Sequence, residues 1–187
     1  MKSPYLIAIL AASLLSTSTG ILTAQDTDKT PAKCKVCGDP AKDGPTAEYE
    51  EVVYQFCSNE CVKKFNEERT ASLYQQLGGK AAINAAVDLF YVKVLADDRV
   101  NFFFEDINMN AQKRKQKEFL SAALGSPVAW TGKDMRKAHA NLDLKEADFG
   151  AIAENLNATL VELGISNELI GQVMTLVGST KDDVLNK

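Results

Sequence analysis

The chain has 187 residues, of which 45% are hydrophobic and 25% are charged, and its formal net charge at pH 7 is −4. This composition is typical of a globular protein and excludes a disordered or collagen-like chain. The acidic balance argues against a nucleic-acid-binding protein, because such proteins usually carry a basic face. The basic run KRKQK at residues 113–117 is short, and we interpret it as a solvated helix face.

The first 24 residues have the layout of a secretory signal: Lys2, an apolar core over residues 5–15, and then small or polar residues up to Ala24. The apolar run with its Ser/Thr tail approaches spanning length, so an uncleaved membrane anchor stays open. In either case we expect an exported protein, periplasmic or secreted, that touches a membrane only if this segment is retained. Residues 25–33 form a polar linker.

A cysteine-rich stretch follows over residues 34–68, with the spacing Cys34-x2-Cys37, nineteen residues, then Cys57-x3-Cys61. Two close pairs separated by a short stretch form a metal-site pattern. We expect a strand within residues 48–56 and a helix capped by Ser58, with Cys61 in its first turn. Ligation by sulfur alone suits Zn²⁺ or Cu⁺. Two disulfides are the alternative, because the protein is expected to be exported and its cysteines are even in number.

From residue 71 onward the sequence changes to helical periodicity without cysteine, so we place a domain boundary near residues 68–71. Residues 71–187 are predicted to be all-α, with about five or six helices joined by glycine-rich turns. A short helix is expected to begin near Asp134. Gly164 is expected to end one helix and Ser166 to cap the next. The longer helical segments are residues 80–98, 108–125, 145–164 and 166–185.

His139 is the only histidine of the chain. A lone histidine on a helix is usually structural, but this one shares a face with Met135, Ala138 and Leu142. A neutral imidazole on an apolar helix is what a haem iron needs on its proximal side, and its other ring nitrogen should then find a backbone carbonyl. A single histidine excludes bis-histidine ligation within one chain, and the lack of a CxxCH motif excludes c-type attachment of haem.

Residues 33–67 resemble the small YHS/TRASH-type metal-binding domains, through the motif CxxCG and the stretch FCSNECVKKF. The tyrosine–histidine–serine triplet that names part of that family is missing, so the resemblance is to the broader group. It implies a zinc-ribbon-like or TRASH-like module that binds a transition metal through its four cysteines.

Residues 72–187 resemble group I truncated haemoglobins over their full length, through segments such as KEFLSAALGSP, TGKDMRKAHANLDL and LGISNELIGQVM. The resemblance implies a two-over-two helical sandwich around one haem b, with His139 as the proximal ligand of the iron. It places the distal tyrosine at Tyr91 and the distal polar positions at Gln112 and Gln116. Further haem contacts fall on Phe104, Phe119 and Met135, and Lys113 and Lys115 are expected to reach the haem propionates.

Gln112 and Gln116 are four residues apart and so share one helix face, and with Tyr91 they offer one hydroxyl and two amide donors to bound O₂. We therefore expect reversible binding of O₂, NO or CO. The resemblance also suggests nitric oxide dioxygenation, which needs a separate electron donor because no flavin or nicotinamide fingerprint is visible. The alternative is a metal- or redox-sensing or delivery protein whose main site is the cysteine module. A helical domain that has lost haem is disfavoured by the joint presence of His139, Phe104 and Tyr91.

Overall fold

The computed structural model describes residues 32–187. The expected signal segment, and nearly all of the expected linker, lie outside the described residues. Within the described part, none of the helices combines the length and the apolar character needed to cross a bilayer.

In the cysteine-containing part, the turn that carries Cys34 and Cys37 is followed by a two-stranded antiparallel hairpin, β1 (Thr46–Tyr49) and β2 (Val52–Gln55), in which Tyr49 pairs with Val52. The predicted strand within residues 48–56 is confirmed by β2, but the chain does not form one continuous strand over the whole of that range. Glu50 and Glu51 break it, because both take the left-handed conformation, with φ of 48° and 67°. This is the geometry of a tight hairpin turn, but glycine or asparagine normally marks such a turn, and a Glu–Glu pair gives no such signal.

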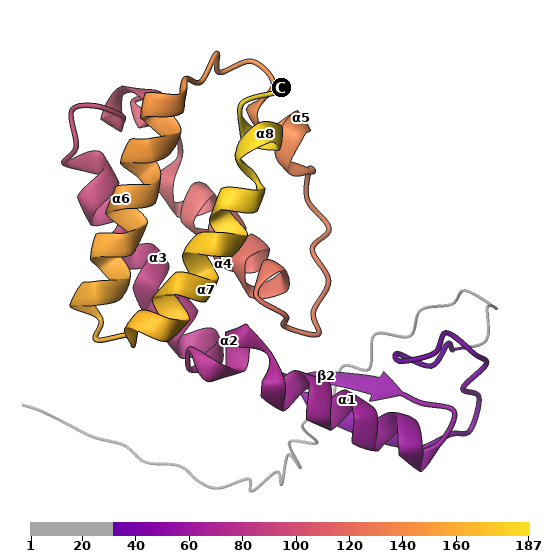
Figure 1. The fold of residues 1–187 in the computed structure, drawn as a ribbon. Coiled ribbons are helices and arrows are strands. Elements are labelled where there is room, and N and C mark those ends of the chain that lie inside the picture. The colour runs from indigo at the N-terminus through magenta and orange to yellow at the C-terminus, as the bar shows by residue number, and fades with distance from the viewer. Residues whose placement is uncertain (1–31) are drawn as a thin grey trace, which may run out of the picture. The chain divides into compact units, whose positions relative to one another are not determined.

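Helix α1 (Asn59–Ala71) follows the hairpin and begins as predicted, because the Ser58 hydroxyl accepts a hydrogen bond from the backbone N–H of Cys61 at 3.3 Å. The rings of Tyr54 and Phe56 each lie 5.1 Å from the ring of Phe65 in α1. These three aromatic side chains pack together and hold the hairpin against α1. Figure 1 shows β2 beside α1.

Every regular element within residues 72–187 is a helix, which confirms the all-α prediction for this part. This part contains seven α-helices and one 3₁₀ segment, η1, whereas five or six helices were predicted. The difference arises partly because Thr180 divides the last predicted segment into two helices, and partly because short helices are counted. Gly164 has a φ of 72° after α6, and the Ser166 hydroxyl caps α7, both as predicted. The elements are α2 (Leu73–Gln76), α3 (Gly79–Leu95), η1 (Asn101–Phe104), α4 (Met109–Ala123), α5 (Met135–His139), α6 (Glu146–Glu162), α7 (Asn167–Ser179) and α8 (Lys181–Val184).

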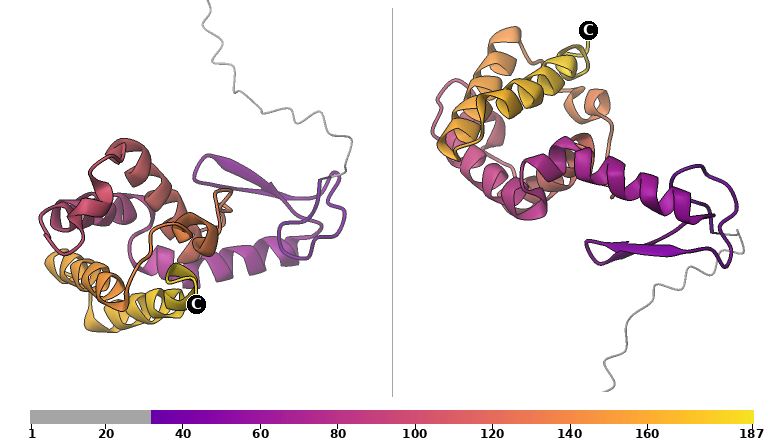
Figure 2. Two further views of the ribbon diagram at one scale, coloured as in Figure 1. Left: turned by 90° about the horizontal axis from the view of Figure 1, so that it is seen from above. Right: turned by 60° about the horizontal axis from the view of Figure 1, so that its bottom comes forward.

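The helices form two layers of two. Helix α3 packs on α4, α6 packs on α7, and contacts between α3 and α6 join the layers. Figure 1 shows α6 and α7 in front of α3 and α4, and Figure 2 shows the same pairs from two other directions. Helix α3 is the most buried element: Leu95 at its end is 41% exposed, but five apolar residues at three- and four-residue steps enter the core. These residues are Ile83, Val87, Phe90, Tyr91 and Val94.

The loop after α3 is tied to α6 by polar contacts. The amide of Asn155 in α6 donates to the Asp97 carboxylate at 2.7 Å, and the guanidinium of Arg99 lies 2.9 Å from the same carboxylate. The hydrogen bonds from Arg99 and Asn155 hold the pKa of Asp97 well below its usual range. This network fixes the chain direction just before η1.

Candidate functional site

The proximal candidate His139 lies at the end of the short helix α5, which begins at the predicted residue because the Asp134 carboxylate accepts from the N–H of Lys137 at 2.8 Å. The Nδ1 atom of His139 lies 2.8 Å from the carbonyl oxygen of Met135, one turn earlier. A carbonyl oxygen can only accept, so Nδ1 carries the proton and donates. The predicted backbone acceptor is therefore confirmed, and in the neutral ring Nε2 is the nitrogen that keeps a free lone pair, as a metal-ligating imidazole requires.

A contact that the sequence did not suggest holds α5 in place. The guanidinium of Arg136 lies 2.9 Å from the Asp183 carboxylate of α8 and donates to the carbonyl of Lys187 at 2.9 Å. Helix α8 therefore steadies the helix that carries His139. Beside His139 is a cavity of about 340 Å³, whose walls come from the loop after α5 and from the end of the chain.

The distal candidates lie on α3 and α4. Tyr91 is only 2% exposed, and the side-chain amide of Gln112 donates to its hydroxyl oxygen at 3.0 Å. Because that oxygen accepts from Gln112, its own proton remains available to another acceptor. Burial raises the pKa of Tyr91, and the hydrogen bond from Gln112 only partly opposes this, so the hydroxyl stays a neutral donor. Gln116 lies one turn further along the same face of α4 and is half-buried.

An aromatic side chain of η1 contacts Tyr91, and a second aromatic pair lies further along α4. The ring of Phe104, at the end of η1, meets the Tyr91 ring edge-on with 5.8 Å between their centroids. Further along α4, Phe119 meets Trp130 in the same way, also at 5.8 Å. The indole N–H of Trp130 donates to the carbonyl of Lys133 at 2.9 Å, which shapes the loop that leads to α5.

The predicted haem-binding residues fit a large, flat and apolar group. Helix α4 has an apolar face but buries none of its own residues fully. The apolar candidates Phe104, Phe119 and Met135 are half-buried, and Leu142 is 43% exposed. Apolar side chains left this open usually mark a surface that another group covers. The donor set, one imidazole with a free Nε2, is also what an iron porphyrin needs.

The basic residues of α4 divide into two roles. Lys113 and Lys117 both pair with Asp88 of α3, at 3.3 Å and 2.9 Å, and so bind α4 to α3. Lys115 is exposed and forms no ion pair within residues 32–187, so it is free to meet a carboxylate such as a haem propionate.

The structure brings the four cysteines together. Their sulfur atoms all lie within 4.8 Å of one another. The Sγ atom of Cys57 is 3.4 Å from that of Cys37 and 3.5 Å from that of Cys61, and Cys61 is 4.0 Å from Cys37. All four are free thiols, and Cys34 is buried.

The sulfur atoms influence one another's ionisation. Burial acts to raise the pKa of Cys34, but backbone N–H groups of Cys37, Cys57 and Val36 point at its sulfur and lower that pKa to about 6. The neighbouring sulfur of Cys57 instead raises the pKa of Cys61. One thiolate thus forms readily while the next is disfavoured, and a bound cation removes this conflict because it stabilises every thiolate at once.

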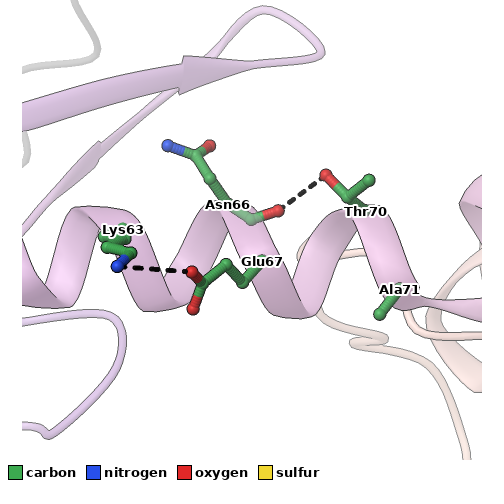
Figure 3. Close-up of a pocket in the computed structure, with 5 residues that line it drawn as sticks. All are labelled: Lys63, Asn66, Glu67, Thr70 and Ala71. Carbon is green, nitrogen blue, oxygen red and sulfur yellow. Dashed lines mark hydrogen bonds and ion pairs between the residues drawn. The ribbon is translucent and has the colours of Figure 1, made fainter.

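A surface depression lies on α1 (Figure 3), and neither the cysteines nor the predicted haem contacts line it. It is lined by Lys63, Asn66, Glu67, Thr70 and Ala71. Its only charged groups form an exposed ion pair, Lys63 with Glu67 at 3.8 Å, so it offers no reactive group.

Comparison with known proteins covers the helical part. The family described as bacterial-like globin matches residues 72–186. The group 1 truncated hemoglobin of Tetrahymena thermophila is 47% identical over 116 residues, which are 62% of this chain and 96% of that protein. Group 1 truncated hemoglobin GlbN of Synechocystis is 43% identical over 123 residues, 63% of this chain and 99% of its own.

Solved structures agree. The 2/2 hemoglobin from Synechococcus, described in the cyanomet state and with covalently attached heme, is 50% identical with a TM-score of 0.60, covering 63% of this chain and 100% of its own. The truncated hemoglobin of Tetrahymena pyriformis in its Fe(III) form is 44% identical with a TM-score of 0.60, covering 62% and 99%. Structures also exist of variants of that protein in which a tyrosine or either of two glutamines is replaced.

The two layers of helices and this match define residues 72–186 as a globin. More particularly, the chain belongs to the bacterial-like globin family as a group 1 truncated haemoglobin, which confirms the resemblance predicted for this part. The four cysteines lie before the matched residues.

Proposed function

We propose that this chain holds haem b through Nε2 of His139 and binds diatomic gases on the other face of the iron. The observation that carries the proposal is the hydrogen bond from Nδ1 of His139 to the Met135 carbonyl, because it fixes the tautomer that can ligate iron. When bound, haem supplies an iron that coordinates O₂, NO or CO and, in its ferrous state, an electron for converting O₂ and NO to nitrate.

Tyr91 and Gln112 are proposed to stabilise a bound gas. Gln112 orients the Tyr91 hydroxyl from 3.0 Å, so that the hydroxyl proton points to a further acceptor. In the Tetrahymena pyriformis protein the replaced tyrosine and the two replaced glutamines are separated by 21 and then four residues, as are Tyr91, Gln112 and Gln116 here. This equal spacing supports a distal role for all three residues.

The remaining candidates would hold the haem itself. Phe104, Phe119 and Met135 are apolar, half-buried and come from three different elements, so together they suit the faces and edge of a porphyrin. Lys115 would meet a propionate, since its neighbours Lys113 and Lys117 are already paired with Asp88.

An absorption spectrum tests the haem proposal. Full-length protein supplied with haem should show a Soret band and shift it with CO. In His139→Ala the band should be lost or strongly changed. The matched control is Lys137→Ala, two residues earlier on the same helix, which removes an exposed side chain whose one ion pair within residues 32–187 is with Asp134. A CO spectrum in His139→Ala identical to that of the unaltered protein would refute the ligand assignment.

Nitric oxide dioxygenation is the reaction we propose for this site. It requires O₂ held by donors such as Tyr91, and a separate reductase that returns one electron to the iron in each cycle. Mixing the oxygenated ferrous protein with NO in a stopped-flow instrument should give rapid oxidation to the ferric form with nitrate as product. Slow or no reaction would remove this activity and leave reversible gas binding intact.

For the cysteine part, we propose a site for Zn²⁺ or Cu⁺. A tetrahedral ion with metal–sulfur bonds of about 2.3 Å spaces its sulfur atoms about 3.8 Å apart. The observed separations of 3.4, 3.5 and 4.0 Å lie around that value. Metal analysis and thiol counting on the full chain should find one ion and four protected thiols. Two disulfides without metal would contradict the proposal and the metal-sensing or delivery role that rests on it.

We also propose that the protein is exported, from the signal-like layout of its first 24 residues. Cell fractionation and the mass of the mature chain test this. Recovery of uncleaved protein in the cytoplasmic fraction would refute export, while recovery of uncleaved protein in the membrane fraction would favour an anchor.

A further inference from the structure

We propose that metal binding at the four cysteines slows the release of gas from the haem iron, through a contact between Glu50 and Tyr74. This inference rests on the haem site and the metal site proposed above. It adds a connection between the two sites, which runs through contacts within residues 32–187.

The first step is the contact between the hairpin tip and the start of the globin fold. The hydroxyl of Tyr74 in α2 donates to the Glu50 carboxylate at 2.6 Å. Beside it, the hydroxyl of Tyr49 donates to the side-chain oxygen of Gln75 at 3.3 Å, and the guanidinium of Arg69 lies 4.7 Å from the centre of the Tyr49 ring. A carboxylate that accepts from a hydroxyl forms a strong hydrogen bond. The tip is therefore fastened to α2.

The second step leads from α2 to the distal helix. Tyr74 is 1% exposed, and its backbone N–H donates to the carbonyl of Leu124 at 2.8 Å, directly after the end of α4. Next to it, a Cβ atom on Gly125 would lie 3.0 Å from the Cβ of Ser72, so the two segments are in close contact. Tyr74 thus holds the C-terminal end of the helix that carries Gln112.

The third step leads from the sulfur cluster to the hairpin. Cys57 follows β2 closely, and the backbone N–H of Lys35, in the turn between the first two cysteines, donates to the carbonyl of Gln55 in β2 at 3.1 Å. An ion bound by all four sulfurs would join this turn, the end of β2 and the first turn of α1 by four bonds. The hairpin would then be held at its base by the metal and at its tip by Tyr74.

The functional consequence follows from these three steps. With metal bound, the hairpin is fixed, α4 is held through Tyr74, and Gln112 keeps the Tyr91 hydroxyl aligned for the gas. Without metal, the base of the hairpin is held only by the aromatic packing on Phe65 and by the Lys35–Gln55 hydrogen bond, so the hairpin moves more freely and the alignment at the far end of α4 loosens. Coupling between two sites in one protein typically changes affinity about 5- to 150-fold, and a path through one helix end should give about fivefold.

The experiment measures O₂ dissociation from the full-length haem-loaded protein, with one equivalent of Zn²⁺ and after its removal by a chelator. Removal should speed dissociation about fivefold in the unaltered protein. In Tyr74→Phe and Glu50→Gln, the ratio of the O₂ dissociation rates in the metal-free and zinc-bound states should be close to one. The matched control is Glu51→Gln, which changes the adjacent, exposed turn residue and should keep the ratio. Amide hydrogen exchange of residues 118–125 provides a second readout, with faster exchange expected in the metal-free state.

Equal dissociation rates in the two states of the unaltered protein would overturn the proposal, and so would an unchanged ratio in Tyr74→Phe. Zinc content and the Soret band are measured on the same samples. If the protein binds haem but no zinc, the metal-site proposal is wrong and the coupling is wrong with it. If the protein binds both and its O₂ dissociation rate does not depend on zinc, only the coupling is wrong.

Discussion

Replacing Tyr91 by phenylalanine removes one hydroxyl from a side chain that is 2% exposed and leaves the ring in place. The Tyr91 oxygen accepts from Gln112 at 3.0 Å, so the lost group is the hydroxyl proton that would be donated to the bound gas. O₂ on ferrous haem carries partial negative charge, and a hydrogen bond to a charged partner contributes about 1.5–3 kcal/mol. The O₂ dissociation rate should therefore rise about 10- to 150-fold, since about 1.4 kcal/mol corresponds to a factor of ten.

The assay is displacement of O₂ by excess CO in a stopped-flow instrument, with CO dissociation measured separately. Bound CO is less polarised than O₂, so its dissociation rate should change much less. Tyr54→Phe is the control for the substitution itself, because Tyr54 lies in the cysteine-containing part and packs on Phe65. An unchanged O₂ rate in Tyr91→Phe, or an equal change for O₂ and CO, would refute the assignment of Tyr91 as a hydrogen-bond donor to the ligand.

Four substitutions test the fold. Gly125→Ala should lower the free energy of unfolding by about 1–3 kcal/mol, because φ is 97° at this position. Gly150→Ala, which adds a methyl group in open space on α6, should raise the free energy of unfolding by up to about 1 kcal/mol. Urea unfolding measures both changes. Ser58→Ala should cost about 1 kcal/mol of helix stability, and an unchanged unfolding midpoint would show that its cap is dispensable. The hydrogen bond from Arg99 lowers the pKa of Asp97, so this carboxylate stabilises the fold above its unfolded pKa of about 3.9 and stops doing so as the pH falls further. Asp97→Asn should flatten the acid limb of the stability curve, and an acid limb identical to that of the unaltered protein would contradict this.

The long helices could be predicted from the sequence because their stabilising pattern is local. Apolar residues recur with helical periodicity in α3 and α6, and Asp134 and Ser166 cap the helices they precede. The acceptor for His139 was predictable for the same reason, since a residue one turn earlier on the helix supplies it. These features depend on residues at most four positions apart.

What the sequence did not show depends on distant residues. The turn at Glu50 and Glu51 lacks the usual turn residues. Its tip is held by Tyr74, 24 residues further along the chain, and no periodicity signals such a contact. The basic run on α4 was interpreted as solvated, but Lys113 and Lys117 both pair with Asp88. That pairing depends on how α3 and α4 pack, which a single sequence does not specify.

Helix α4 has fifteen residues, and none of them is fully buried. If haem covers the apolar face of α4, it acts as a ligand that binds the folded chain and not the unfolded one. Such a ligand raises the free energy of unfolding by about 2.7 kcal/mol when its concentration is about one hundred times its dissociation constant. A cell short of haem would then keep less of this protein, because the unfolded fraction is exposed to proteases. Haem supply would thereby set the protein's abundance without any change in its transcription.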